Sequence, residues 1–596
     1  MITLLNKLRK WFLSPDSRLE LGLRTLYHKI LTTRLAFLLQ DWLAKRSYRK
    51  WRRKHLNRST NHVDDFQEIP LVTFVLFCPE GLTPKAQATI QSIKNLQGES
   101  REVILFVPGE VQNQDNLSAV QAKSDIRSVV RQIEDVLDVA NGEFLVFCAT
   151  GDQFYDPLLI RFYQSVEKDS SIDLLYYDCE YFDVTSGQMA PHFKPGKISP
   201  ELLLSVNYLS RGFFRTDAAR QVVANFELPK GFFAFEYALA LKISEKPKSI
   251  SHLTAMLANQ TKLVLPKDDD LRDVITKHLS RQGLDGVCYE ERFNLPRFFW
   301  KVRDPSVAMI ILTKNHHHYL ENLLKSIDRH TRDSKHEILI VDNGSDDQAT
   351  LAYYEKIDQV QNIRIVVYDK PFNYSEAINL GVGSSDSDLV LLLNDDMKVG
   401  NDLWLDELTQ WAIRPEIGVV GVKLLRENHT IQHAGIIMGL NGFAGHLYLN
   451  APEHYQGLFG PVDWYRNVLA VTGACQMIRR EVFDAVGGYD EGYQLAFGDI
   501  DFCLRVHQVG YSNMVTPFTN IFHYEGLTRG YTTPTGDILK GLDDMEGILV
   551  EGDPYYSPHL SLTRIPKCDL SPSSRASRIQ QIESRKAFYK NAEKWS

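Results

Sequence analysis

Cysteine is scarce in this sequence and follows no pattern. The chain has seven cysteines in 596 residues, and no two of them form a Cys-x-x-Cys pair. This spacing excludes a disulfide framework and the common zinc sites, and it favours a reducing compartment. The chain also lacks an unbroken run of about 18 apolar residues, which a membrane-spanning helix needs. The pattern of a secretory signal peptide is missing too. We therefore expect a cytoplasmic protein.

The length and composition indicate several globular domains. Hydrophobic residues make up 44% of the chain and charged residues 24%, which is typical of soluble globular proteins. A chain of 596 residues is too long for one hydrophobic core, so two or three domains are expected.

The charge is unevenly distributed along the chain. Residues 1–60 contain 15 Lys and Arg against 3 Asp and Glu, a net charge of +12 in a chain whose total is −8, which leaves −20 for the remainder. Apolar residues recur there near helical spacing: Leu19, Leu21, Leu23, Leu26, Ile30, Leu31, Leu35, Leu38, Leu39 and Trp42. Such a helix can lie on an anionic membrane surface, or it can pack on the body with its arginines in solvent, which we favour. Nucleic acid is not expected, because the remainder is acidic.

The most informative segment is an apolar run that leads directly into acidic residues. Residues 389–393 are leucine and valine, and Asn394, Asp395 and Asp396 follow. Such a run is typical of a strand buried in a parallel sheet, which presents its ligand sites at the carboxyl ends of the strands. Carboxylates at that position suit Mg²⁺ or Mn²⁺. A solvated turn is the alternative.

Two further polar clusters follow apolar elements downstream. Asp499 and Asp501 enter a helix with apolar residues at helical spacing, where capping is an ordinary explanation. His523 follows a short strand-like run, where a structural histidine is equally ordinary. Two pairs of carboxylates and then a histidine thus follow one another along the chain, each next to an apolar element. This order predicts that they share one site.

Residues 305–536 resemble the family 2 glycosyltransferases, which are inverting enzymes with the GT-A fold that use nucleotide sugars. The matching segments are 309–315, 338–345, 372–375, 394–396 in the place of the DXD motif, 471–475 and 487–491. Over nearly the whole chain, including residues 553–558, the sequence also resembles two-domain bacterial proteins described as rhamnosyltransferase-like or O-antigen biosynthesis proteins.

The resemblance implies a role for each polar position. Asp396 is implied as the direct ligand of Mg²⁺ or Mn²⁺, and His523 completes the contact between metal and diphosphate. The residues implied in donor binding are Thr313, Asn315, Asp342, Asn343, Asn394 and Asp395. Turn chemistry is the alternative for the loop at Asp342 and Asn343.

The resemblance also places the acceptor and the catalytic base. Inversion requires a carboxylate that takes the proton of the acceptor hydroxyl, and Asp499 aligns with the catalytic Asp of the family. Asp501 supports the helix or contacts the acceptor. Trp464 and Tyr465 are candidates for stacking on an acceptor sugar, although such aromatic residues are more often part of a core.

An internal repeat divides the chain. Residues 70–77, 102–107 and 141–148 parallel residues 307–312, 337–341 and 386–393. We therefore predict an α/β protein with two tandem GT-A-like domains, which are Rossmann-like with mostly parallel sheets, preceded by basic helices. The segments are a basic amphipathic part (1–66), a degenerate domain (67–262), a linker with one helix (263–304), a catalytic domain (305–536) and a C-terminal tail (537–596).

The first copy has lost most of the polar positions. It has Ala149-Thr150-Gly151-Asp152 after the matching strand, Glu236 near the second cluster, and Ala258-Asn259-Gln260 in the place of the histidine. It is therefore predicted to be a transferase fold without catalysis.

These observations predict a metal-dependent hexosyltransferase. It would move a sugar from a nucleoside diphosphate sugar to a growing bacterial surface polysaccharide or a lipid-linked glycan. Peripheral contact of residues 1–60 with the inner face of the cell membrane stays the alternative to packing on the body. Rhamnose fits the resemblance, but UDP- and GDP-sugars use the same loops. A non-catalytic scaffold of a polysaccharide-assembly complex and a two-headed polymerase are the alternatives.

Overall fold

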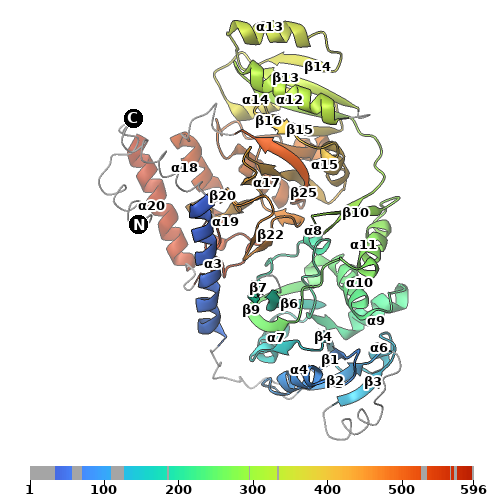
Figure 1. Cartoon of the computed structure of the whole chain (residues 1–596). Helices are drawn as coiled ribbons and strands as arrows, with labels where there is room; N and C mark the ends of the chain where they lie inside the picture. Colours follow the sequence, from blue (N-terminus) through green and yellow to red (C-terminus); the bar gives the residue numbers. More distant parts are fainter. Residues whose placement is uncertain are drawn as a thin grey trace.

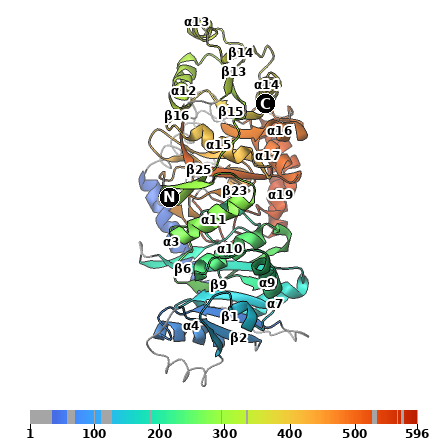
Figure 2. The same cartoon turned by 90° about the vertical axis from the view of Figure 1, so that its right-hand side faces the viewer.

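The computed structural model shows two α/β domains that follow one another along the long axis of the molecule (Figures 1 and 2). It describes residues 34–56, 70–98, 100–108, 126–183, 187–293, 295–331, 335–524, 533–563, 565–569 and 574–593. The basic residues before position 34, and most of the apolar positions noted among them, lie outside the described residues. Within the described residues, no helix combines the length and the hydropathy that crossing a bilayer requires.

The first domain is built on a mostly parallel sheet with the order β3-β2-β1-β4-β8-β6-β9-β5, and β7 pairs with β6. Its strands are β1 (Val72–Phe77), β2 (Arg101–Phe106), β3 (Ile126–Val130), β4 (Phe144–Ala149), β5 (Gln153–Phe154), β6 (Leu174–Asp183), β7 (Gln188–His192), β8 (Phe213–Arg215) and β9 (Ile250–Gln260). Its helices are α4 (Pro84–Lys94), α6 (Val136–Val139), α7 (Leu158–Lys168), α8 (Pro200–Leu203), α9 (Thr216–Asn225), α10 (Phe232–Ser244) and the 3₁₀ turn η1 (Pro247–Ser249).

The second domain repeats this topology strand for strand, in the order β14-β13-β12-β15-β24-β17-β25-β16. Its main strands are β12 (Val307–Thr313), β13 (His336–Asp342), β14 (Ile363–Val367), β15 (Leu389–Asn394), β16 (Met397–Val399), β17 (Ile417–Leu425), β24 (Cys475–Arg479) and β25 (Ser512–His523). Short strands are β18 (Ile431–His433), β19 (Ile436–Met438), β20 (Ala444–His446), β21 (Gln456–Gly457), β22 (Gly460–Pro461) and β23 (Arg466–Val468). The predicted fold class is confirmed.

Helices cover the second sheet. They are α12 (His317–His330), α13 (Gln348–Ile357), α14 (Tyr374–Gly383), α15 (Trp404–Ala412), α16 (Arg480–Ala485), α17 (Gly498–Gln508) and the 3₁₀ turn η2 (Leu440–Gly442). The start of α14 is fixed by Asn373, whose side chain accepts a hydrogen bond from the backbone N–H of Glu376. Helix α12 buries Leu320, Leu323 and Ile327 on one face, which is the spacing that an amphipathic helix requires.

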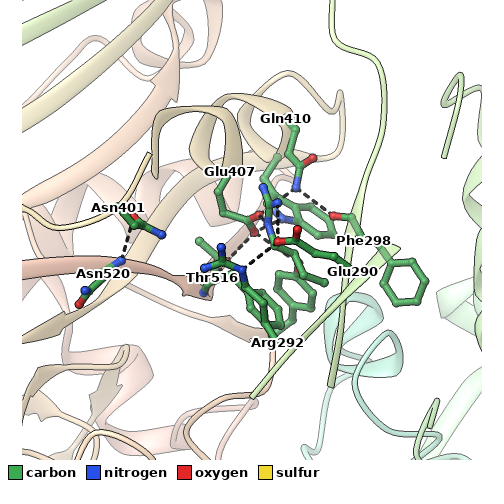
Figure 3. Close-up of polar contacts among 12 residues, drawn as sticks. Glu290, Arg292, Phe298, Asn401, Glu407, Gln410, Thr516 and Asn520 are labelled. Carbon is green, nitrogen blue, oxygen red and sulfur yellow. Dashed lines mark hydrogen bonds and ion pairs between the residues drawn. The ribbon is translucent and has the colours of Figure 1, made fainter. Parts of the chain in front are cut away.

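The segment between the domains is more ordered than a linker with one helix. It forms α11 (Asp269–Arg281) and a hairpin of β10 (Cys288–Arg292) and β11 (Leu295–Phe299). The hairpin is tied to the second domain by the buried carboxylate of Glu407 in α15, which accepts hydrogen bonds from Arg297 of the hairpin and from Thr516 of β25. Figure 3 shows Glu407, Gln410 and Thr516 of the second domain beside Phe298 of the hairpin. Gln410 donates to the carbonyl of Phe298 over 3.1 Å. The hairpin is therefore held rigidly against the second domain.

Helix α3 (Arg34–His55) bridges the domains rather than standing apart (Figure 1). Tyr48 and Arg52 donate to the buried carboxylate of Glu180 in β6, and Trp51 packs edge to face on Phe193. The ring of Phe37, near the other end, packs on Tyr455 of the second domain. For residues 34–56, the interpretation of a helix packed on the body is confirmed.

The C-terminal segment is also folded. It forms α18 (Thr535–Asp544), α19 (Glu546–Glu551) and α20 (Arg575–Glu593), which pack beside the second domain. Between α19 and α20 the chain joins the domains, because the carbonyl of Pro554 accepts a hydrogen bond of 2.8 Å from the N–H of Lys197, while the carboxylate of Asp553 accepts one from Met438.

Candidate functional site

The polar ends of three neighbouring strands meet at one edge of the second sheet. The register places Thr313 of β12 beside Asp342 of β13, and Leu312 beside Asn394 of β15. Because parallel strands end at the same edge, their following loops surround one pocket, with a volume of about 530 Å³. It is lined by Leu312, Thr313, Lys314, Asn315, His316, Asn343, Phe372, Tyr374, Asn394, Asp395, Asp396 and Leu495. Six of the eight predicted donor and metal residues therefore line one pocket, whereas Asp342 and His523 are not among its lining residues.

Asp395 is fixed at the pocket wall by side chains from the first strand and its loop. Thr313 Oγ1 donates to Asp395 Oδ2 over 2.7 Å, and His316 Nδ1 lies 3.5 Å from the same oxygen. Contact with this carboxylate raises the pKa of the His316 imidazole. The motifs do not predict His316. Its position directly after Asn315, in the loop after the first strand, is the sequence signal that could have identified it.

Asp396 and His523 approach each other because their strands pair. Antiparallel pairing of β16 with β25 sets Met397 opposite His523, so the residue before Met397 lies beside the histidine. His523 Nε2 lies 3.1 Å from Asp396 Oδ1, and the amide of Asn394 lies 3.3 Å from the same nitrogen. The predicted pair is therefore brought together at the pocket.

Asp396 and His523 offer an oxygen and a nitrogen of the kinds that bind divalent cations, and the two atoms lie in direct contact at 3.1 Å. Within the described residues, no three His, Cys, Asp or Glu side chains converge as a complete metal site. A cation here would therefore take further oxygen ligands from water or a bound phosphate, as Mg²⁺ does in many enzymes.

The loops after the first and second strands are held by their own polar side chains. The Asn315 side chain accepts hydrogen bonds from the N–H groups of Asp346 and Asp347, and its backbone has a φ of 56°. Asp342 is buried and accepts hydrogen bonds from Ser345 and from the hydroxyl of Tyr354. Asn343 donates its N–H to the carbonyl of Thr313. These contacts shape the loops, and the donor-binding roles of the residues stay predictions.

Asp499 lies in the first turn of α17 and is linked to the pocket residue Tyr374 through Gly473. Its Oδ2 accepts a hydrogen bond of 2.8 Å from the N–H of Gly473. The hydroxyl of Tyr374, which lines the pocket, donates to the carbonyl of the same glycine over 3.4 Å. A Cβ at Gly473 would lie 3.2 Å from Tyr374 Oη and 3.3 Å from Asp499 Cβ. The glycine therefore allows the close approach of the helix to the pocket.

Asp501 has a different environment from Asp499. It accepts a hydrogen bond of 2.8 Å from Arg505 Nε, one helical turn later. Burial raises the pKa of its carboxyl, against the opposing effect of Arg505. The side chain thus supports α17.

The two aromatic candidates for acceptor stacking are separated by the structure. Tyr465 is 0% exposed, and it packs on Trp411 and Phe518 while its hydroxyl contacts Glu407. Its prediction as an acceptor residue is wrong, because a side chain without exposed surface cannot stack on a ligand. Trp464 lies at a second pocket, between the domains.

In the first domain, a buried arginine lies beside the position that corresponds to the acidic residues of the second-domain pocket. Asp152 directly precedes β5, as Asp396 directly precedes β16. The buried guanidinium of Arg211 donates a hydrogen bond to Asp152 Oδ2 over 2.8 Å, and the backbone N–H of Arg211 donates to Glu236 Oε1 over 2.7 Å. In the second domain the backbone N–H of Gly473 donates to the carboxylate of Asp499 in the same way. The carboxylates that the first copy retains are therefore neutralised by a cation of the chain itself.

Residues 308–487 match the family model described as Glycosyl transferase family 2, and the chain thus contains a domain of that family. The matched residues include the strand edge, Asp395 and Asp396, whereas Asp499 and His523 follow the match.

Similar proteins have names from glycan synthesis. The O-antigen biosynthesis protein RfbC of Myxococcus xanthus is 33% identical over 471 residues, which are 76% of this chain and 36% of that protein. The chain therefore spans about a third of the length of RfbC. The N-acetylglucosaminyl-diphospho-decaprenol L-rhamnosyltransferase of Mycobacterium tuberculosis is 24% identical over 239 residues, 36% of this chain and 74% of that protein. A crystal structure of GalNAc-T7 with UDP, GalNAc and Mn²⁺ aligns with a TM-score of 0.35 and 14% identity, over 43% of this chain and 50% of that one.

Proposed function

We propose that the protein is an inverting glycosyltransferase that moves a sugar from a nucleoside diphosphate sugar to a bacterial surface polysaccharide or a lipid-linked glycan. The observation that carries this proposal is that Thr313, Asp395 and Asp396 line one pocket at the strand ends of the second domain, with His523 directly behind Asp396 at 3.1 Å. The family match supports glycosyl transfer. The names of the relatives support an O-antigen or a lipid diphosphate acceptor, and rhamnose as one donor sugar.

Asp396 and His523 are the residues that would hold Mg²⁺ or Mn²⁺. Such a cation, when bound, supplies Lewis-acid neutralisation of the leaving diphosphate. Thr313 and His316 hold Asp395 in a fixed orientation beside that position. The loops at Asn315 and Asn343 shape the rest of the donor pocket.

Asp499 is proposed as the base that accepts the proton of the acceptor hydroxyl. Its carboxylate is oriented by the N–H groups of Gly473 and Ile500, and it lies in the first turn of α17, where the helix dipole favours the charged form. The carboxylate of Asp501 accepts a hydrogen bond from Arg505, so Asp501 is the weaker candidate for the catalytic base.

The test is a donor screen that measures the release of nucleoside diphosphate with Mg²⁺ or Mn²⁺ present. Asp499→Asn should lower kcat by about 10²–10⁴-fold, the contribution of a general base, with donor affinity nearly unchanged. Asp396→Asn and an excess of EDTA should both abolish turnover. The matched control is Asp388→Asn, which changes an exposed acid just before the amino end of β15, the strand that leads to Asp396. Full turnover by Asp499→Asn, or in EDTA, would overturn the corresponding role.

We also propose that α3 contacts the membrane. Its buried residues face the body, but Leu38, Leu39, Trp42 and Leu43 are exposed together on the same helix. The last turn of the helix carries Arg52, Arg53, Lys54 and His55. An exposed apolar face with basic residues suits an anionic lipid surface, and it would keep the enzyme near a lipid-linked acceptor.

The buried arginine of the first domain bears on the alternatives. A two-headed polymerase needs a catalytic site in each domain. In the first domain, Asp152 and Glu236 are both already paired with Arg211. A scaffold without catalysis stays the alternative for the whole chain, and an absence of turnover with every donor would favour it.

A further inference from the structure

A second pocket lies between the two domains, with a volume of about 770 Å³. The first domain contributes residues 181–183 at the end of β6 and residues between 262 and 268 after β9. The second domain contributes residues between 454 and 464, and the hairpin contributes Phe293 and Leu295. Among the described residues, none lines both this pocket and the pocket at the strand ends. The interdomain pocket is thus a separate feature, and the first domain forms much of its wall.

Aromatic rings are exposed at this pocket. Phe182 is 48% exposed and Phe293 is 38% exposed, and both line it together with Tyr181 and Trp464. Exposed aromatic faces gathered in a cavity of this size are typical of ligand sites. They also offer flat apolar surfaces on which another ring can stack.

The ring of Phe293 is held in place by the hairpin. Its backbone has a φ of 53°, the left-handed region that residues other than glycine rarely adopt. The hairpin cannot relax freely, because Arg297 donates a hydrogen bond to Glu407 in the core of the second domain. The ring also packs against the imidazole of His454, with 4.7 Å between the centroids. The stacking surface is therefore formed before any ligand binds.

The charges at the pocket are balanced. Asp463 Oδ1 is 2.7 Å from Lys423 Nζ, and its Oδ2 is 3.0 Å from His454 Nδ1. The other charged lining residues are Asp183, Asp268, Lys262 and Lys267, two of each sign. A phosphate or a nucleotide would gain little net attraction here. A neutral ligand with many hydroxyl groups would find both donors and acceptors, including the amide of Gln456 and the hydroxyl of Tyr181, which lie 3.2 Å apart across the domain boundary.

We propose that the interdomain pocket binds a neutral oligosaccharide, as a subsite for the part of the acceptor glycan that does not react. Sugar rings present apolar C–H faces to the aromatic side chains and hydroxyl groups to the polar rim. The identity of this ligand as acceptor rests on the proposed transferase function, whereas the binding itself does not. The subsite gives the first domain a role in the reaction without any catalytic group of its own.

The test uses the full chain on an array of neutral and uronic-acid-containing bacterial oligosaccharides. The wild type should bind neutral members, and Phe182→Ala should weaken this binding by about tenfold, the contribution of one aromatic stacking contact. Phe182→Trp should retain it. The matched control is Phe588→Ala, which removes a phenylalanine that is 53% exposed on α20. The proposal is overturned if no neutral oligosaccharide binds, if acidic ones bind better, or if Phe182→Ala binds like the control.

A second measurement separates this proposal from the proposed function. Release of nucleoside diphosphate with water as acceptor should be unchanged in Phe182→Ala, because Phe182 does not line the strand-end pocket. Phe372→Ala, in the strand-end pocket, should retain oligosaccharide binding. If Phe372→Ala lost as much oligosaccharide binding as Phe182→Ala, the glycan would bind at the strand-end pocket, and the proposal would be overturned. Glycan binding without turnover of any donor would uphold the subsite and refute the transferase function.

Discussion

Replacing Arg211 with methionine should destabilise the first domain by about 3–5 kcal/mol at pH 8, the usual cost of breaking a buried ion pair. The guanidinium has no exposed surface, and it lies 2.8 Å from Asp152 Oδ2 and 3.3 Å from Glu236 Oε2. Methionine fills a similar volume, so the loss comes from the carboxylates that are left buried without a cation. Because a domain is stable by only about 5–15 kcal/mol, the loss is a large part of the total.

The same cluster predicts a pH dependence. Burial raises the pKa of Glu236 to about 7 from its ordinary value of 4.5, against the opposing effect of Arg211. The folded state therefore binds a proton that the unfolded state releases above pH 4.5. The resulting stabilisation is fully present below that pH and is lost as the pH rises through about 7. Glu236→Gln should remove this part of the dependence.

Hydrogen–deuterium exchange read peptide by peptide can measure both effects, because it reports on the first domain separately from the second. The matched control is Arg215→Met in β8, whose partly exposed guanidinium pairs with Asp173 at 3.6 Å and donates to the carbonyls of Ile172 and Ser170, so a smaller loss of about 1–2 kcal/mol is expected. Adding Asp152→Asn and Glu236→Gln to Arg211→Met should restore much of the protection, since positions 152 and 236 then no longer carry buried negative charges without the arginine. Equal protection of Arg211→Met and Arg215→Met at pH 8 would refute the reasoning.

Two further outcomes are expected. Asp501→Asn should lower the stability of the second domain by about 1–3 kcal/mol while kcat changes little, because it weakens a partly buried hydrogen bond to Arg505; a loss of rate equal to that of Asp499→Asn in a folded protein would exchange their roles. Changing both Leu39 and Trp42 to glutamate should reduce flotation of the full chain with anionic liposomes, with neutral liposomes as the control. Equal flotation of the variant and the wild type would leave α3 as a packing element only.

The sequence predicts the second domain well because its signals are local. The apolar run before Asn394 identifies a buried strand, and polar residues at its end must lie at the edge where parallel strands end. The repeat predicts the first sheet in the same way, since β1, β2 and β4 correspond to β12, β13 and β15. Strand pairing then brings Asp396 to His523, residues far apart in the chain.

The sequence does not predict what depends on distant side chains. Asp152 was identified as a remnant of the acidic cluster, but Arg211 follows it by 59 positions with no local pattern that marks it as its partner. Tyr465 and Trp464 are adjacent in sequence, but Tyr465 is fully buried against Trp411 and Phe518, and only Trp464 lines a pocket. The sequence does not predict the hairpin, because its strands have five residues each and β10 is mostly charged.

The two domains share one fold but differ in how their buried carboxylates are paired. A buried carboxylate must be protonated or paired, since isolated charge is costly inside a protein. In the first domain Arg211 supplies the cation from the chain, so the charge of Asp152 is satisfied before any ligand arrives. In the second domain His316 lies 3.5 Å from Asp395, and His523 lies 3.1 Å from Asp396. The proposed function assigns a divalent cation to Asp396, whereas Arg211 already pairs with Asp152 in the first domain.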